Sequence, residues 1–235
     1  MEESTQIQDN LAFVHTEIRS ACLLAGRPED SVRLLLATKT VEPERIRMAI
    51  AAGETLIGEN KVQEYQQKAD ALADLNCERH FIGHLQTNKV KDILKYVTCI
   101  QSVDRITLAE KLQSQLENLD RELDIYIQIN TSGEQSKSGA APEEALRLME
   151  HLTALPRLKV KGLMTIGLFS DNEVLVRKSY ALLRTFRDKG LEQGLLPGGP
   201  LELSMGMSGD LNWAIQEGST MVRVGSAVFG KRNYH

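Results

Sequence analysis

The sequence predicts an α/β fold: a single (β/α)8 barrel, or TIM barrel, that spans residues 1–235 with one extra helix in front. Its 235 residues suit one such barrel, which typically needs about 250. Apolar runs of strand length alternate with helix-like segments along the chain, as expected for parallel strands joined by helices. Polar residues follow the apolar runs, which is where barrels carry their chemistry.

The expected elements follow from apolar periodicity and from glycine and proline breaks. The first helix covers residues 5–25, because Ile7, Leu11 and Val14 recur at helical spacing before Gly26 ends it. Eight strands are expected at residues 33–39, 56–60, 80–83, 99–103, 124–130, 158–166, 201–205 and 221–229. Seven helices are expected between them, at residues 43–52, 61–72, 87–96, 106–119, 142–155, 172–190 and 211–217. An open doubly wound sheet is the structural alternative.

Composition excludes several classes of protein. The net charge of −4 argues against nucleic acid as a partner, because a phosphate backbone requires clustered Lys and Arg. No apolar run approaches the roughly 20 residues that span a membrane, and the acidic start does not resemble a signal peptide. Cys22, Cys77 and Cys99 show no paired spacing, and no histidines have metal-ligand spacing. We therefore expect a cytoplasmic protein without membrane association or a metal site.

Lys39 is the sharpest single signal, because it ends the apolar run of the first expected strand. A lysine held against an apolar barrel interior is poorly solvated, which lowers its pKa and favours the neutral amine that condenses with an aldehyde. The alternative is an ordinary lysine that extends into solvent or pairs with Glu59.

A second signal lies at the ends of the last two strands. Phosphate sites in barrels often use the loops after strands seven and eight. Gly225 permits close backbone approach and Ser226 adds a hydroxyl, while Ser204 and Ser208 lie on the neighbouring strand end. The alternative is a glycine bulge without a ligand. Strand eight neighbours strand one in a closed barrel, so this phosphate site and Lys39 would lie in the same opening at the carboxyl ends of the strands. A phosphorylated aldehyde would satisfy both features.

Arg223 and Asn60 are further candidates at strand ends. A guanidinium stays charged, so Arg223 set against a pyridine nitrogen would keep that nitrogen unprotonated. A surface pair with Glu217 is the equally weighted alternative. Asn60 suits either a ring contact or a helix cap. We expect His84 and Lys137 to be solvated.

At these residues the sequence resembles the pyridoxal phosphate homeostasis protein family, also called YggS-like or proline synthetase co-transcribed proteins. The resemblance covers nearly the whole chain. The segments that carry it are residues 36–40, 58–64, 80–89, 128–130, 136–139, 162–164, 203–208 and 221–230.

The resemblance implies the fold-type III barrel that binds pyridoxal 5′-phosphate (PLP) and is related to the barrel domain of alanine racemase. It implies that Lys39 carries PLP as a Schiff base and that Arg223 faces the pyridine nitrogen. It places Ser204, Gly225 and Ser226 at the phosphate and Asn60 near the ring. We add Ser208 to these cofactor-binding residues because it lies beside the expected phosphate site.

We expect a PLP carrier that serves intracellular PLP homeostasis and influences amino-acid and keto-acid pools, rather than an enzyme. Racemases of this fold type use a second domain and a catalytic tyrosine, and no tyrosine here falls at an expected strand end. The expected partners are PLP and PLP-dependent apo-enzymes, and the expected state is a monomer. A weak racemase or another Schiff-base lysine enzyme, such as a class I aldolase, is the alternative.

Overall fold

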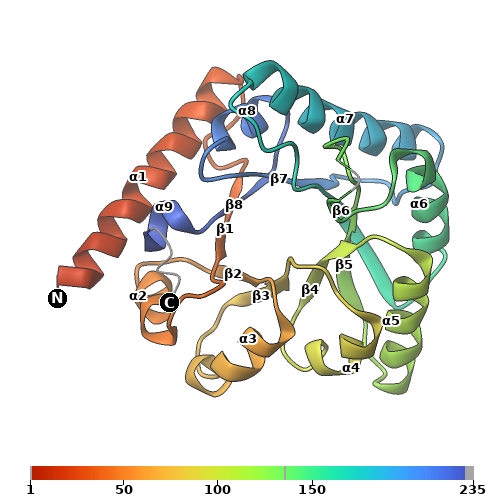
Figure 1. Cartoon of the computed structure of the whole chain (residues 1–235), viewed down its shortest axis with the longest axis horizontal. Coiled ribbons are helices and arrows are strands. Elements are labelled where there is room, and N and C mark those ends of the chain that lie inside the picture. The colour runs from red at the N-terminus through yellow and green to blue at the C-terminus, as the bar shows by residue number, and fades with distance from the viewer. Residues whose placement is uncertain (1, 135, 231–235) are drawn as a thin grey trace.

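The computed structural model of the chain describes residues 2–134 and 136–230. Its parallel strands form a closed barrel in the order β1 to β8 (Figure 1). The barrel closes where β1 pairs with β8 and Leu36 lies opposite Val224. The strands are β1 Arg33–Ala37, β2 Leu56–Glu59, β3 Glu78–Phe81, β4 Cys99–Val103, β5 Leu123–Gln128, β6 Leu158–Met164, β7 Glu202–Met207 and β8 Met221–Val224. The predicted barrel is confirmed, and the open sheet is excluded.

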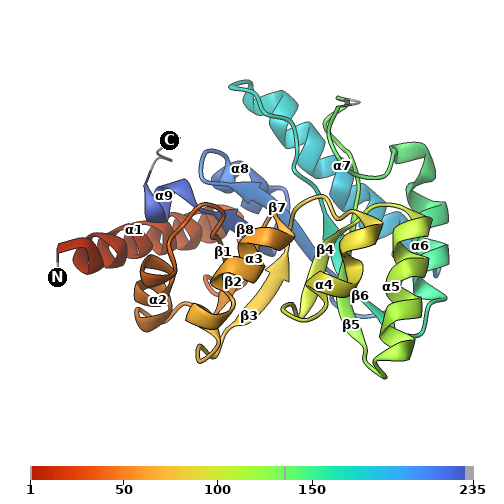
Figure 2. The ribbon, with the colours of Figure 1, turned by 60° about the horizontal axis from the view of Figure 1, so that its bottom comes forward.

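Helices surround the barrel, and the leading helix occupies the outer position beside the β1–β8 closure. It packs against α2, α8 and α9 (Figure 1). Helices α3, α4 and α5 lie side by side along the outer face of the strands (Figure 2). The helices are α1 Glu2–Leu24, α2 Pro43–Ala51, α3 Val62–Lys68, α4 Val90–Ile93, α5 Ile106–Asn118, α6 Ala145–Thr153, α7 Glu173–Glu192, α8 Leu211–Gln216 and α9 Ser226–Phe229, with 3₁₀ turns η1 Asp70–Leu72, η2 Thr87–Lys89 and η3 Pro142–Glu144.

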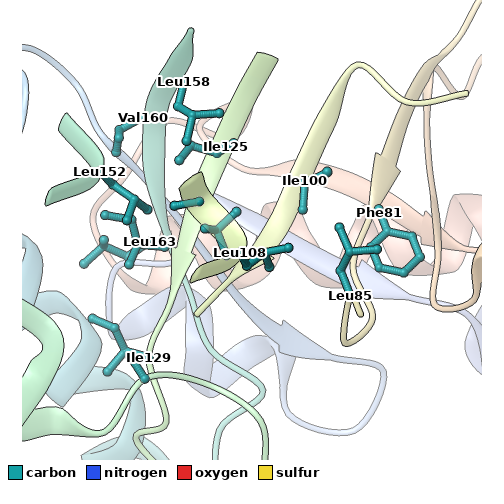
Figure 3. Packing of buried hydrophobic residues seen from close by; sticks show 14 of the residues in the cluster. Phe81, Leu85, Ile100, Leu108, Ile125, Ile129, Leu152, Leu158, Val160 and Leu163 are labelled. Carbon is teal, nitrogen blue, oxygen red and sulfur yellow. The ribbon is translucent and has the colours of Figure 1, made fainter. Parts of the chain in front are cut away.

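The core has one layer inside the barrel and another between the strands and the helices. In the layer between the strands and the helices, Leu152 of α6 packs towards Leu163 and Val160 of β6 (Figure 3). Alternation along each strand sends successive side chains to opposite faces, so both layers are filled from the same strands. The cluster inside the barrel consists of Leu35, Leu56, Cys99, Tyr126, Met164 and Met221.

Most elements differ from their predicted bounds by only a few residues, and the last strand and two helices differ more. Strand β8 ends at Val224 instead of continuing to Phe229, because the φ of −126° and ψ of −66° at Gly225 turn the chain into α9. The apolar residues after Gly225 are therefore helical, although their pattern is typical of a strand. The expected helix at residues 87–96 consists of η2 followed by the short α4, and α3 ends at Lys68 before η1.

No helix in the described ranges is both long enough and apolar enough to cross a membrane.

Candidate functional site

A cavity of about 520 Å³ opens at the carboxyl ends of the barrel strands. It lies over β1, β2 and β8, and the loops after β6 and β7 form its other walls. Six of the seven residues predicted from the sequence line it, and Ser204 does not. The lining residues are Ala37, Lys39, Asn60, Ile82, Ile166, Phe169, Ser170, Asp171, Met207, Ser208, Gly209, Asp210, Trp213, Arg223, Gly225 and Ser226.

Lys39 is half-buried in this cavity, two residues beyond the end of β1. Leu35 belongs to the cluster inside the barrel, so strand alternation directs Ala37 and Lys39 towards the same side. Thr38 faces the helical layer, where its hydroxyl donates to Glu59 Oε1 over 2.8 Å. The sequence thus places a lysine amine in the mouth of the barrel.

The backbone turns sharply after Lys39. Thr40 has a φ of 61°, which is uncommon for a β-branched residue. Its N–H donates to Glu64 Oε2 over 2.7 Å, and its hydroxyl donates to the carbonyl oxygen of Lys39 over 2.6 Å. These contacts hold the chain in the left-handed conformation and fix the direction in which it leaves the cavity.

Gly225 and Ser226 form the wall of the cavity next to β1. A Cβ atom on Gly225 would lie 2.8 Å from the carbonyl oxygen of Ala37, so only glycine lets β8 end this close to β1. Ser226 begins α9, and the first N–H groups of any helix lack intrahelical acceptors. Its hydroxyl donates to the hydroxyl of Ser208 over 3.3 Å. The ends of β7 and β8 therefore present hydroxyl and N–H groups to one space.

Arg223 forms part of the cavity floor and is buried, with 6% of its surface exposed. Its Nη1 atom donates to the carbonyl oxygen of Ser204 over 2.7 Å, and its Nη2 atom donates to that of Thr165 over 2.7 Å. Burial lowers the pKa of the guanidinium, and the nearby Tyr180 and Asp210 oppose that shift.

The alternative pairing of Arg223 with Glu217 does not occur. The Glu217 carboxylate accepts from Arg177 Nε over 2.9 Å and from Arg184 Nη1 over 3.1 Å. Arg223 instead takes its acceptors from β7 and from the end of β6. The guanidinium is therefore part of the barrel and not of the outer helical surface.

Ser204 lies below the cavity floor, where it is fully buried. Its hydroxyl accepts from Arg223 Nη1 over 2.8 Å and donates to Gln101 Oε1 over 2.6 Å. This placement differs from the expected one beside Ser226. The reason is distance along the strand: Ser204 is in the middle of β7, while Ser208 follows its end.

Asn60 brings an unsatisfied polar atom to the cavity. Its Oδ1 atom is buried and has no hydrogen-bond partner within the part of the chain that the structure describes. A Cβ atom on Gly83 would collide with the backbone oxygen of Asn60, so the loop after β3 packs directly against this residue. A buried acceptor without a donor is costly, which is typical of a position where a ligand supplies the missing hydrogen bond.

Other polar candidates lie outside the cavity. His84 is exposed, with Nδ1 at 3.6 Å from Asp104 Oδ2. Lys137 contacts Glu134 at 2.8 Å and donates to the carbonyl oxygen of Gly167. Asn130 organises the loop after β5: its side-chain amide donates to the backbone oxygens of Glu134 and Lys137.

The sequence did not single out several residues that line the cavity. Ile166 and Phe169 come from the loop after β6, and Phe169 is 89% exposed. Asp210 accepts from the Tyr180 hydroxyl over 2.8 Å and from the Met207 N–H over 2.6 Å, which orders the loop after β7. The large apolar residues Ile166, Leu168 and Phe169 lie close together in this loop, and they are the signal that could have identified the first pair.

Comparisons with known proteins show the family and the fold to which this chain is similar. The model of the family described as "Alanine racemase, N-terminal domain" matches residues 33–233. A protein of Aquifex aeolicus named pyridoxal phosphate homeostasis protein is 44% identical over 226 residues, which are 96% of this chain and 98% of that protein. PipY of Synechococcus elongatus, solved with PLP bound, is 32% identical with a TM-score of 0.81, and the match covers 95% of this chain and 100% of PipY.

An alanine racemase from Clostridium difficile shares the fold. It is 16% identical with a TM-score of 0.75, and the match covers 96% of this chain but 57% of the racemase. At this identity the likeness concerns the barrel alone. The family model and the relative from Aquifex show that the chain belongs to the alanine racemase N-terminal domain family, alongside proteins named pyridoxal phosphate homeostasis protein.

Proposed function

We propose that this chain binds PLP as a Schiff base on Lys39 and serves PLP homeostasis as a carrier. The observation that carries the proposal is that one cavity holds Lys39 on one strand end and Gly225 and Ser226 on the next. An amine and a group of anion-binding donors in one mouth suit an aldehyde that carries a phosphate. In the binding step the amine adds to the aldehyde carbon, a C=N bond forms and water leaves.

The remaining cavity residues suit the other parts of the cofactor. Ser208, Gly225 and Ser226 would hold the phosphate through hydroxyl and N–H groups. Arg223 would face the ring nitrogen, and a charged guanidinium there keeps that nitrogen unprotonated. Asn60 would contact the ring region, where its Oδ1 atom, which has no partner among the described residues, would accept a hydrogen bond from the ligand. The residues therefore fit the group, which supplies an electrophilic aldehyde when bound.

The names of the relatives support the same function. The protein of Aquifex aeolicus and a human protein, 38% identical over 238 residues, are both named pyridoxal phosphate homeostasis protein. PipY contains PLP in its solved structure. We extend that cofactor and that role to this chain on the strength of its own cavity.

A carrier is favoured over a catalyst by the composition of the cavity. Racemisation requires an acid and a base on opposite faces of the substrate carbon. Among the described lining residues none is a tyrosine, histidine or cysteine. The Asp210 carboxylate already accepts two hydrogen bonds. Asp171 is the other carboxylate in the described lining and is exposed, so we favour a carrier, and a weak racemase is the alternative.

The partners follow from how open the site is. Ser226 is exposed and Lys39 is only half-buried, so another protein could receive the cofactor directly at the mouth. We propose PLP-dependent apo-enzymes as recipients, a monomer as the working state, and the cytoplasm as the location, where both PLP and these enzymes are used.

An absorbance spectrum of the purified protein mixed with PLP tests the proposal. A Schiff base on Lys39 absorbs near about 420 nm and loses that band on borohydride reduction, after which mass mapping locates the modified lysine. Lys39→Ala should abolish the band, while the control Lys61→Ala, at an exposed position next to Asn60, should retain it. Label on another lysine, or a band that persists in Lys39→Ala, would refute the assignment.

The racemase alternative is tested separately. Deuterium exchange at the α-carbon of alanine or serine should stay at the level of PLP alone. Exchange that requires Lys39 would show that the protein is a catalyst and would refute the proposed carrier role.

A further inference from the structure

A row of four buried polar side chains crosses the interior of the barrel below the cavity. Ser204 connects Arg223 to Gln101, with distances of 2.8 Å to Arg223 Nη1 and 2.6 Å to Gln101 Oε1. Gln101 Nε2 then lies 2.8 Å from His80 Nδ1. At the far end, His80 Nε2 lies 3.5 Å from Glu78 Oε2, at the start of β3.

The hydrogen-bonding capacity of each group fixes the direction of this row. Arg223 can only donate, so the Ser204 hydroxyl accepts from it and turns its own hydrogen to Gln101 Oε1. The Gln101 amide must then present its N–H groups to His80 Nδ1 and to the sulfur of Met221, at 3.1 Å. His80 Nδ1 is therefore an acceptor, and the neutral ring carries its hydrogen on Nε2, towards Glu78.

The surroundings make this row exceptional. The barrel interior is otherwise filled by an apolar cluster that includes Leu35, Leu56 and Met164. A buried polar network in such surroundings stabilises a protein less than apolar residues of the same volume. Ser204, Gln101 and His80 are each at most 3% exposed. The row contacts the cavity through Arg223, which suggests that its role is to serve that residue.

We propose that Ser204, Gln101 and His80 are positioning residues that hold the Arg223 guanidinium in the plane in which it meets the cofactor ring nitrogen. The inference rests on the proposed function. The carbonyl oxygens of Ser204 and Thr165 fix one edge of the guanidinium, and the Ser204 hydroxyl adds the contact whose direction Gln101 and His80 determine. Ser204 thereby acts on the ring side of the cofactor and not on the phosphate.

The test compares Ser204→Ala and Gln101→Met with Ser219→Ala. Ser219 is a matched control, because it is a fully buried serine between β7 and β8 whose hydroxyl bonds only backbone oxygens among the contacts described. Dissociation constants are measured for PLP and for a 1-deaza analogue, which has C–H in place of the ring nitrogen.

Both variants in the row should weaken PLP binding about five- to tenfold, the effect of about one buried hydrogen bond. They should leave the affinity for the 1-deaza analogue within about twofold of wild type, because that ring offers Arg223 no acceptor. On an Arg223→Met background the loss for PLP should disappear, since residues that act through one group are not additive. Equal weakening of both ligands, or additivity with Arg223→Met, would overturn the positioning role and leave the proposed function intact.

Nitrogen NMR of the protein without cofactor gives a readout that does not depend on binding. His80 should show an unprotonated Nδ1 and a protonated Nε2, and Gln101→Met should change that tautomer signature while Ser219→Ala does not. The Arg223 guanidinium should rotate slowly, and faster in Ser204→Ala. A His80 ring protonated on Nδ1 in the wild type would contradict the proposed direction of the row, whether or not PLP binds.

Discussion

The ammonium group of Lys68 lies 2.7 Å from Glu59 Oε1, in a buried ion pair behind the strand end that carries Lys39. Lys68 also donates to the carbonyl oxygen of Thr38 over 2.8 Å, and the Thr38 hydroxyl donates to Glu59 over 2.8 Å. Glu64, which holds the strained Thr40, lies 3.6 Å from Lys68. One ion pair in the helical layer thus fixes the backbone on both sides of Lys39.

Replacing Lys68 tests how much this ion pair contributes to the stability of the fold. Lys68→Met should lower the free energy of unfolding by about 3–5 kcal/mol, because it leaves the Glu59 carboxylate buried without its cation. Urea denaturation measures the loss. Lys91→Met, at an exposed position of α4, is the control and should stay within about 0.5 kcal/mol of wild type. If both variants lose the same small amount, the pair does not contribute as the contacts indicate.

The pH dependence of stability tests Glu59 itself. Burial raises the pKa of its carboxyl above the usual 4.5, against the opposing effect of Lys68. The folded state therefore holds this proton more tightly than the unfolded state. The contribution of Glu59 to stability is complete below about pH 4.5 and declines as pH rises through the raised pKa.

Glu59→Gln should remove that decline. Urea denaturation from pH 4 upward, at about one-unit steps, gives the slope for each protein. Wild type should lose stability with rising pH relative to Glu59→Gln. A difference between the two proteins that stays constant or grows in the opposite direction would show that the folded-state pKa is not raised.

Much of the barrel could be predicted from periodicity, because strand-length apolar runs, such as Leu34-Leu35-Leu36 in β1, alternate with helix-like segments. The end of β8 could not. Residues 226–229 are as apolar as a strand, and only the backbone angles at Gly225 determine that they form α9. Short apolar segments do not distinguish helix from strand by pattern alone.

The site could be predicted as far as strand ends identify it. Lys39, Arg223 and Ser226 follow from the rule that barrel chemistry lies at the carboxyl ends of strands. The depth of Ser204 could not be predicted, because β7 continues to Met207, beyond its predicted end at residue 205, and leaves Ser204 in the middle of the strand. Lys68 was also not identified: its position on α3 gives no sign that it reaches Glu59.

Substitution of Gly225 tests the close approach of β8 to β1. In Gly225→Ala the new Cβ atom meets the carbonyl oxygen of Ala37 at 2.8 Å, so the wall that would hold the phosphate must move. Overpacking of this kind costs about 1–3 kcal/mol. We expect PLP affinity to fall at least about tenfold, which corresponds to about 1.4 kcal/mol. Absorbance titration measures the affinity.

The matched control for that variant is Gly198→Ala. Gly198 has open space around the position of a Cβ atom and lies in the loop before β7, away from the cavity. Its affinity should equal that of wild type. An unchanged affinity in Gly225→Ala would show that the cofactor phosphate does not depend on this wall.

Asn60 separates binding from stability. Its buried Oδ1 atom has no hydrogen-bond partner among the described residues, and an unsatisfied group of this kind costs about 1–3 kcal/mol. Asn60→Ala should therefore leave the unfolding free energy of the protein without cofactor unchanged or higher, while PLP affinity falls about five- to tenfold as one ligand hydrogen bond is lost. Urea denaturation and absorbance titration measure the two quantities on the same preparation. A loss of stability together with unchanged affinity would show that Asn60 supports the fold instead of the ligand.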